Sequence, residues 1–293
     1  MITSVAAVVR LLRPEQWLKN GFVAAPMVFA GLFLDPAAWW RCTLAVVGFC
    51  VASSLTYVLN DLIDRDADRA HPEKCRRPIA SGEVGPATAA LVMLVLAALT
   101  GTVAVMLGGR FPLVVAVYLG LTTAYSLALK RAVFVDVMLV ALGFVLRVVG
   151  GAVAVGVPVS RWLLLCTFLL ALYLALGKRR AELVLLGAEA GNHRAVLGHY
   201  TLPLVDQAIS VVLGATVLAY TLYTVAEDTV AKVGSEGLMA TVPVVLYGLF
   251  RYLYVLHRHE LGGSPARVLL TDRPLLACVL LWLAMSAAVL TVL

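Results

Sequence analysis

Residues 42–68 read CTLAVVGFCVASSLTYVLNDLIDRDAD, an apolar run that ends abruptly in acidic residues. The apolar part carries no charged residue, and its length suits a helix that crosses a bilayer, which takes about 20 residues. A charged group is costly inside a bilayer, so the acids should lie at its edge. The segment therefore predicts a membrane helix with a polar end at the water interface.

Similar apolar runs recur along the 293 residues, of which 62% are hydrophobic and 14% charged, and this composition excludes a soluble globular domain. Continuous runs predict helices rather than the short alternating strands of a membrane barrel. We therefore predict an all-α polytopic membrane protein, with one catalytic domain over residues 1–293 built as a bundle of nine transmembrane helices. The expected spans are 21–38, 41–59, 87–107, 111–129, 133–157, 161–177, 204–226, 237–256 and 275–293.

The basic residues predict the orientation of these spans. With nine spans, most of the 23 lysines and arginines fall in loops on the same side of the membrane as the N-terminus. Loops rich in lysine and arginine lie in the cytoplasm. We therefore expect the N-terminus and the long polar loops in the cytoplasm and the C-terminus outside.

The acidic end of the first run is the strongest indication of chemistry. At 100° per residue, Asn60, Asp61, Asp64 and Asp68 fall within an arc of about 100°, and Asp66 falls on the far side. Carboxylates on one helix face repel each other unless a cation lies among them. Mg²⁺ takes oxygen ligands from one or two carboxylates and from substrate phosphates. We expect these three facing aspartates to be catalytic and, with the asparagine, to hold Mg²⁺ against a diphosphate.

Residues near the acidic segment add candidates to this metal–diphosphate site, and others suggest an alternative explanation for the acids. Tyr57 continues the polar face into the membrane and is a candidate substrate contact. Lys74 and Arg77 could reach phosphate oxygens that the metal leaves uncovered, or could serve only to set the topology. The alternative for the acids is a solvated helix end that pairs with Arg65 and Arg69, which predicts no clustering on one face.

The expected span 133–157 contains two charged residues. Asp136 and Arg147 share a helix face but lie about 16 Å apart at 1.5 Å per residue. An arginine inside a membrane usually faces a cavity or a partner. We expect both residues to line a substrate cavity, with room left by Gly143 and Gly150. The alternative is a structural pair between Arg147 and a group on another helix.

The motifs resemble a known family. The acidic segment NDLIDRDAD (60–68), followed by the turn RPIASG (77–82), resembles the UbiA-type prenyltransferase superfamily of nine-helix membrane proteins. That superfamily usually carries a second Asp-rich motif after the sixth helix, but residues 177–183 read GKRRAEL, which is basic and fits an anionic partner instead. The segment YSLALK (125–130) resembles the superfamily too, and it makes candidate substrate contacts of Tyr125, Ser126 and Lys130.

Other segments resemble one branch, the decaprenyl-phosphate phosphoribosyltransferases. They are RPEQWLKN (13–20), residues 176–183, and GGSP (262–265) with DRPL (272–275). The resemblance implies Mg²⁺-dependent transfer of 5-phosphoribose from phosphoribosyl pyrophosphate (PRPP) to a polyprenyl (decaprenyl) phosphate. Pyrophosphate would be released, in cell-wall arabinan synthesis at a bacterial plasma membrane.

Within the first of these segments, Lys19 is a further candidate for binding substrate. Arg13, Gln16 and Asn20 form a stripe that we expect at the cytoplasmic entrance of the site. Trp17 is interpreted as an anchor at the membrane interface.

After the sixth span, Lys178, Arg179 and Glu182 share an arc of about 100° if the segment is helical. Either basic residue could bind the ribose 5-phosphate or the lipid phosphate. Glu182 could orient one of them or a ribose hydroxyl. The alternative is a basic belt at the membrane interface. His193, His199 and Tyr200 follow, and no role is predicted for them.

Two other functions compete with phosphoribosyl transfer. One is a prenyltransferase that moves a prenyl group from a prenyl diphosphate to an aromatic or quinone acceptor. The other is a transporter, although transporters place ionisable residues near the midplane of the membrane. The expected partners are PRPP, a polyprenyl phosphate lipid and the membrane, with no nucleic acid. Homo-oligomer formation is left open.

Overall fold

The computed structural model describes residues 4–32, 34–70, 74–187, 191, 195–258 and 265–291, and the regular elements of this part are helices, as predicted. Six segments of this described part are long and apolar enough to cross a membrane, so the chain is a multi-pass membrane protein. Nine spans and the orientation of the termini stay predictions. The six are α3 (Pro36–Ile63), α5 (Pro86–Leu107), α7 (Val135–Val155), α8 (Arg161–Leu186), α10 (Leu202–Val225) and Gly237–Arg258, which joins η6 (Gly237–Thr241) to α12 (Val242–Arg258).

Two shorter apolar helices, α6 (Phe111–Leu127) and α14 (Arg273–Thr291), coincide with two further expected spans. The first expected span, 21–38, is wrong as a single helix. The chain there forms a 3₁₀ helix, η1 (Pro14–Ala24), and one short helix, α2 (Ala25–Phe29).

Two local features separate this segment from α3. Gly31 has a left-handed φ of 73°, which glycine adopts without steric cost and which stops a helix from continuing. The carboxylate of Asp35 then accepts a hydrogen bond from the Ala37 amide at 2.9 Å and begins the new helix as its N-cap.

The chain folds as two compact units. Unit 1 comprises residues 1–130 and 143–159, and unit 2 comprises residues 131–142 and 160–293. Helix α7 therefore gives its first residues to unit 2 and the remainder to unit 1. The other elements are α1 (Val5–Leu12), α4 (Arg65–Arg69), η2 (Lys74–Arg76), η3 (Leu129–Arg131), η5 (Ala195–His199), α11 (Glu227–Val233) and α13 (Pro265–Thr271).

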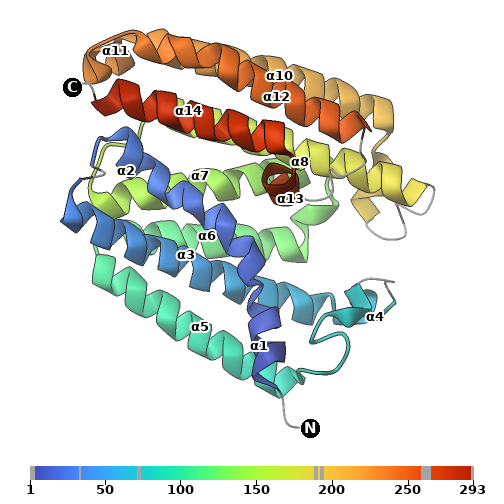
Figure 1. Cartoon of the computed structure of the whole chain (residues 1–293). Helices are drawn as coiled ribbons and strands as arrows, with labels where there is room; N and C mark the ends of the chain where they lie inside the picture. Colours follow the sequence, from blue (N-terminus) through green and yellow to red (C-terminus); the bar gives the residue numbers. More distant parts are fainter. Residues whose placement is uncertain are drawn as a thin grey trace. The chain divides into compact units, whose positions relative to one another are not determined.

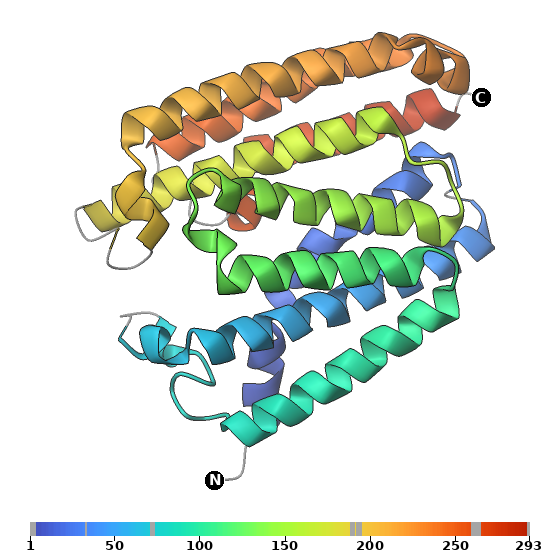
Figure 2. The ribbon, with the colours of Figure 1, turned by 180° about the vertical axis from the view of Figure 1, so that it is seen from behind.

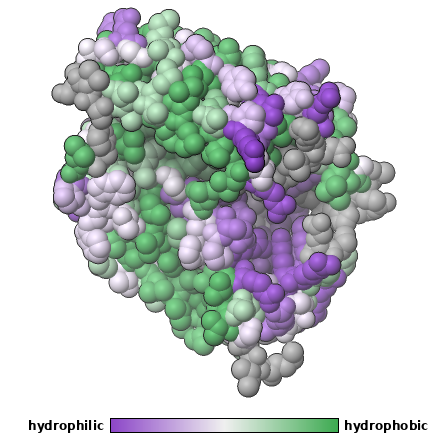
Figure 3. Space-filling model, in the orientation of Figure 1, coloured by the Kyte–Doolittle hydropathy of each residue, from purple (hydrophilic) through white to green (hydrophobic). Residues whose placement is uncertain are grey.

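Helix α3 is the centre of unit 1. It runs beside α5 and also packs against η1 and α6, and α4 lies at its C-terminal end (Figures 1 and 2). Apolar residues cover much of the visible face, whereas hydrophilic residues gather where α4 lies (Figure 3). At the polar end of α3, charged side chains of unit 1 therefore gather at the surface.

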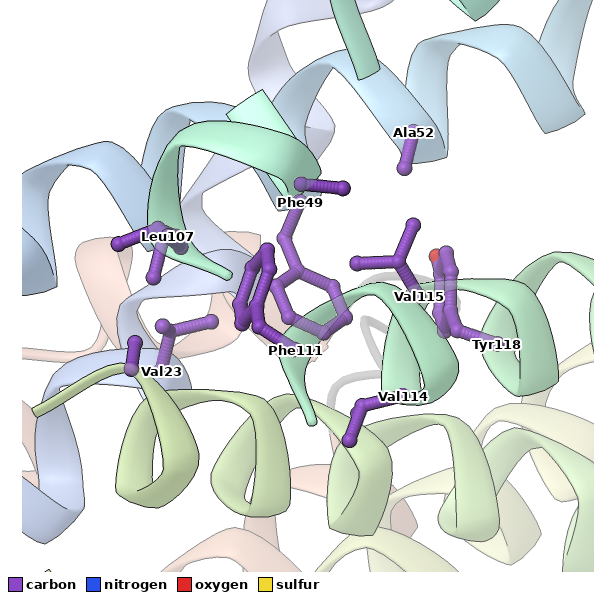
Figure 4. Packing of buried hydrophobic residues seen from close by; sticks show 11 residues of the cluster. Val23, Phe49, Ala52, Leu107, Phe111, Val114, Val115 and Tyr118 are labelled. Atoms are coloured by element: carbon purple, nitrogen blue, oxygen red, sulfur yellow. The ribbon is translucent and has the colours of Figure 1, made fainter. Parts of the chain in front are cut away.

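Three aromatic side chains pack among aliphatic ones in a buried cluster of unit 1 (Figure 4). Phe49 of α3 is fully buried and meets Phe111 and Tyr118 of α6 edge to face, with ring centroids 6.0 Å and 5.3 Å apart. Each such pair contributes about 0.5–1.5 kcal/mol beyond the area that it buries. These contacts fix α6 against α3.

A glycine lets η1 approach α7 closely. A Cβ atom at Gly151 would stand 1.9 Å from the carbonyl oxygen of Val23, well inside van der Waals contact. Gly150 similarly makes room for the ring of Phe49. Neighbouring groups of unit 1 therefore occupy the space beside Gly150 and Gly151. The expectation that Gly150 leaves room for substrate is wrong.

Unit 2 is built around α8, which packs along α10 (Figure 2). The buried hydroxyl of Tyr173 donates to the carbonyl of Leu249 at 2.9 Å and ties α8 to α12. The Tyr220 hydroxyl of α10 lies 2.6 Å from Thr241 and accepts from the Trp282 indole at 2.7 Å, which ties α10 to η6 and α14.

Replacement of Gly151 tests the close approach in unit 1. Gly151→Ala should destabilise the protein by about 1–3 kcal/mol, because backbone atoms must move to admit the methyl group. Gly101→Ala in α5 is the matched control, since a Cβ there meets nothing within 4 Å. Thermal unfolding in detergent measures both, and equal melting temperatures would contradict the described packing.

Candidate active site

The three expected catalytic aspartates, Asp61, Asp64 and Asp68, lie around the junction between α3 and α4. Helix α3 ends at Ile63, and Asp64 adopts a non-helical conformation with φ of −89° and ψ of 6°. The expectation of one continuous helix from Asn60 to Asp68 is therefore wrong. The turn nevertheless keeps helical hydrogen bonds: the Asp64 amide donates to the Asn60 carbonyl at 2.9 Å, and the Asp68 amide donates to the Asp64 carbonyl at 2.8 Å.

One arginine joins two of these acids. Nη1 of Arg77 donates to Oδ1 of Asp61 at 3.1 Å and to Oδ2 of Asp68 at 2.6 Å. Both carboxylates are buried, with side-chain exposures of 2% and 5%. Asp66 points away, is 93% exposed and pairs only loosely with Arg69 at 3.5 Å. The separation of Asp66 from the other acids agrees with the predicted helix face.

Two more cations complete what we term the carboxylate cluster, which consists of Asp61, Asp64 and Asp68 with their basic partners Arg13, Arg77 and Lys130. Arg13 donates to Oδ1 of Asp61 at 2.5 Å, and Nζ of Lys130 lies 2.7 Å and 2.9 Å from the oxygens of Asp64. Each buried or half-buried acid thus has a basic partner, which offsets the cost of removing its charge from water.

The position of Arg13 follows from a corner between α1 and η1. Arg13 has a left-handed φ of 53°, which is strained for a residue with a side chain. The buried hydroxyl of Ser54 on α3 donates to the carbonyl of Leu12 at 2.8 Å and accepts from the indole of Trp17 at 3.0 Å. Ser54 therefore ties both sides of the corner to α3. The corner holds the Arg13 guanidinium beside Asp61 and 5.2 Å from the ring centre of Tyr57.

The turn after α4 carries the remaining part of this site. Gly82 has a left-handed φ of 84°, and the Arg69 side chain donates to the carbonyl of Ala80 at 3.2 Å. This turn holds Arg77 against the acids.

The other candidates of unit 1 are placed as follows: Asn60 half-buried at the end of α3, Lys74 half-buried in η2, Lys19 half-buried in η1, and Tyr125 half-buried beside buried Ser126 near the end of α6.

The donor set fits Mg²⁺, which prefers carboxylate oxygens. Oδ2 of Asp61 is a buried oxygen with no hydrogen-bond partner, as expected of an atom that is completed by a ligand. Within the part of the chain that the structure covers, no three acidic, histidine or cysteine side chains come together as a metal-binding group. Arg77 instead bridges Asp61 and Asp68, so metal binding would require this guanidinium to move aside.

Arg147 lies deep in unit 1 and is 5% exposed. Its guanidinium donates to the side-chain oxygen of Asn20 at 2.7 Å, to the carbonyl of Gly143 at 2.9 Å and to the hydroxyl of Tyr118 at 2.9 Å. Asn20, which was expected at an entrance, is fully buried. The structural alternative therefore describes Arg147 better than the expected cavity lining, because its donors join η1 and α6 to α7.

A second charged cluster lies in unit 2, and we call it the Arg179 cluster. Asp136 is fully buried, accepting from Nε of Arg179 at 2.7 Å and from the Tyr200 hydroxyl at 2.8 Å. Nη1 of Arg179 also donates to Glu182 at 2.6 Å. Asp136 was expected to line a substrate cavity, but an acid without exposed surface cannot touch substrate in this state. Lys178 completes the cluster at 3.9 Å from Glu182.

Three residues of the Arg179 cluster lie on a helix, the conformation under which their spacing places them on one arc. Helix α8 continues to Leu186, beyond the predicted end of the sixth span at residue 177. The side chains of 178, 179 and 182 therefore share one helical face, as the spacing required. His193 and residues 262–264 lie outside the described residues.

Sequence reasoning missed two residues of these clusters. Arg13 was expected in a stripe at the entrance of the site. Its ion pair with Asp61 was not predicted, because the two residues lie far apart in the sequence. Tyr200 received no role, because nothing in its local pattern distinguishes it from a surface residue. Its burial and its two hydrogen bonds depend entirely on tertiary packing.

Within the described residues, six apolar helices long enough to cross a membrane, with charged clusters at the ends of α3 and α8, define a multi-pass membrane protein. Residues 23–271 match the UbiA prenyltransferase family, and the chain belongs to that family. It is therefore a transferase rather than a transporter. Similar proteins include decaprenyl-phosphate phosphoribosyltransferases of Mycolicibacterium smegmatis, 32% identical over 97% of this chain and 92% of the relative, and of Mycobacterium tuberculosis, 34% identical over 97% and 94%.

The fold is also similar to that of a UbiA homolog from Archaeoglobus fulgidus, solved bound to GPP and Mg²⁺. The TM-score is 0.73 at 20% identity, over 97% of this chain and 99% of the other. At that identity the likeness establishes the fold.

Removal of Arg77 tests the carboxylate cluster in the absence of substrate. Arg77→Gln should destabilise the protein by about 2–3 kcal/mol, because two buried carboxylates lose a shared partner that is itself 26% exposed. Arg76→Gln changes an exposed neighbour and should shift stability by less than about 0.5 kcal/mol. Thermal unfolding without Mg²⁺ compares the two, and equal shifts would contradict the shared ion pair.

Proposed function

We propose that this chain transfers the 5-phosphoribosyl group of PRPP to a polyprenyl phosphate and releases pyrophosphate. The observation that carries the proposal is the carboxylate cluster, in which three acids and three basic groups meet at the end of α3. Relatives that align over nearly the whole chain bear the name of this activity, which supports the choice of donor and acceptor.

The acids and the bases of the cluster suit different parts of a metal diphosphate. Asp61, Asp64 and Asp68 are the residues that would hold Mg²⁺, with Asn60 as a further candidate. The metal, when bound, supplies positive charge that stabilises the leaving pyrophosphate. The structural relative bound to GPP and Mg²⁺ supports a divalent ion in this fold.

The basic residues would change partners when the substrate binds. Arg13, Arg77 and Lys130 neutralise the acids in the structure described above. Once a metal occupies the carboxylates, these side chains can donate to phosphate oxygens, and arginine can do so through two parallel hydrogen bonds. The negative charge that develops on the leaving pyrophosphate would then lie beside these basic side chains, which lowers the activation free energy of the transfer.

The proposed reaction exchanges one C–O bond for another. The bond between the anomeric carbon and pyrophosphate breaks, and its electron pair leaves with the pyrophosphate. An oxygen of the lipid phosphate forms the new bond from the opposite face, so the anomeric configuration should invert. A phosphate monoester is largely ionised near pH 7, with a second pKa of about 6, and needs no dedicated general base.

We place the reaction at the cytoplasmic face of a bacterial plasma membrane. PRPP is a highly charged, water-soluble donor, and the basic residues of the cluster lie on the side that the distribution of lysine and arginine assigns to the cytoplasm. The pathway that would use the product, cell-wall arabinan synthesis, is suggested by the resemblance alone. The substrate-binding roles of Lys19, Tyr57, Lys74, Tyr125 and Ser126 also stay predictions.

Turnover of PRPP by purified protein tests the function. Protein in detergent with labelled PRPP, Mg²⁺ and decaprenyl phosphate should form a phosphoribosyl lipid, and chelation of divalent ions should abolish the product. Asp61→Ala, Asp64→Ala and Asp68→Ala should each lower kcat at least about 100-fold, on the scale of losing a group that stabilises charge in the transition state.

Asp66→Ala is the matched control, because its exposed carboxylate lies outside the cluster, and it should keep most of the activity. A parallel reaction offers geranyl diphosphate and a quinone precursor. Turnover of that donor with none of PRPP would replace the proposal by prenyl transfer.

Labelling of an introduced cysteine tests the orientation. Asp66→Cys should react with a membrane-impermeant maleimide in inverted membrane vesicles but not in intact cells, because α4 is expected in the cytoplasm. The protein's own cysteines are first replaced by alanine, and that parent protein is the control. Labelling in intact cells would reverse the proposed orientation.

A further inference from the structure

The arginines of the carboxylate cluster use only part of their hydrogen-bonding capacity. Arg77 donates to both of its acids through Nη1, and Arg13 donates to Asp61 through Nη2. Among the described residues, the other guanidinium nitrogens of these two arginines have no hydrogen-bond or ion-pair partner. They are not among the buried polar atoms that lack a partner, so each has accessible surface. Both guanidiniums can therefore receive a further anion, since a guanidinium carries five N–H donors.

The acids of the cluster, by contrast, are nearly filled. Both oxygens of Asp64 accept from Lys130, at 2.7 Å and 2.9 Å. Oδ1 of Asp61 accepts from Arg13 and Arg77, which leaves Oδ2 as a buried oxygen without a partner. Mg²⁺ demands near-octahedral coordination by several oxygens, so it needs carboxylates that the basic side chains hold. The basic side chains therefore compete with a metal for the aspartates.

The charges of the cluster balance before any ligand binds, because three carboxylates face three basic groups, all within unit 1. A divalent ion alone would leave an excess of positive charge among buried groups, and a diphosphate alone would bring its charge beside three carboxylates. Asp61 and Asp68 are only 2% and 5% exposed, so little water screens either imbalance. The two ligands together offset each other's charge.

We propose that Arg13 and Arg77 make the binding of metal and diphosphate interdependent, because each guanidinium leaves its carboxylate only when a phosphate accepts its hydrogen bonds. The inference rests on the proposed function and states how that site is regulated. The enzyme binds a divalent ion weakly and a diphosphate weakly, and it binds the two together tightly. Such coupling is reciprocal, since each ligand must raise the affinity for the other by the same factor.

The loss of one arginine should change the two affinities in opposite directions. Arg77→Gln removes a competitor of the metal, so the affinity for metal alone should rise. It also removes a donor to the phosphates, so the affinity for diphosphate alone should fall. An arginine that only holds the acids in place would behave differently, because its loss would disorder the site and weaken the binding of both ligands.

Two separate titrations of purified protein in detergent test this difference. Mn²⁺ favours the same oxygen ligands as Mg²⁺, and its electron paramagnetic resonance measures binding without any phosphate. Radiolabelled pyrophosphate is titrated in the presence of EDTA. Arg77→Gln should bind Mn²⁺ about tenfold more tightly than wild type and pyrophosphate about tenfold more weakly, the effect of one hydrogen bond to a charged group. In wild type, pyrophosphate should tighten Mn²⁺ binding about tenfold or more, after correction for their complex in solution.

Arg76→Gln is the matched control, because it removes an exposed positive charge next to Arg77 that pairs with no described acid. Both of its affinities should stay within about threefold of wild type, as expected for an exposed charge. Arg13→Gln is a second test variant and should show the same opposite shifts with Arg77 in place. Thermal unfolding verifies that each variant is folded at the temperature of the titrations.

The outcomes separate this inference from the function on which it rests. If Mn²⁺ binds wild type but not Asp61→Asn, and the folded arginine variants bind it no more tightly than wild type, the inference is wrong and the proposed function stands. Equal tightening in Arg76→Gln would mean a general effect of charge and would also overturn the inference. If wild-type protein binds no Mn²⁺ even with pyrophosphate, or if Asp61→Asn binds it unchanged, the metal site of the proposed function is wrong and the inference falls with it.

Discussion

Arg77 donates to Asp61 and to Asp68 through the same nitrogen, and the candidate site depends on this shared guanidinium. Two buried carboxylates so close together would repel each other at the edge of a membrane, where little water screens them. The turn after α4 brings Arg77 between them, and it does so only because α3 ends at Ile63 and the chain folds back. The end of α3 at Ile63, which helical periodicity in the sequence did not predict, therefore makes the cluster possible.

Each of the two units pairs buried acids with basic side chains. In unit 1, under the proposed function, the basic partners of the acids would turn to phosphate oxygens when a metal and the donor bind. In unit 2 Arg179 donates to both Asp136 and Glu182, and Tyr200 donates to Asp136. Arg147 is a third case, a buried cation that joins η1 and α6 to α7 through neutral acceptors.

Much of the fold and part of the site could be predicted, for reasons visible in single elements. The apolar run of α3 identified a membrane helix, and the acids that follow it identified the end of that helix where the candidate site lies. Both could be predicted because hydropathy and charge are properties of neighbouring residues. The same reasoning failed for residues 21–38, where Gly31 and Asp35 interrupt an apolar segment. For the segment after the sixth expected span, the sequence left the helical conformation open, and the structure shows that residues 178–186 continue α8.

The sequence alone determined a helical membrane transferase of the UbiA family and the position of its acidic motif, because apolar length and the spacing of acids are local features. The tertiary structure decided which charges meet. Arg13 reaches Asp61, Lys130 reaches Asp64, and Tyr200 reaches Asp136, across separations of 48, 66 and 64 residues. Such pairs form where burial makes an unpaired charge or hydroxyl costly, and burial is a property of the packed fold rather than of any short segment.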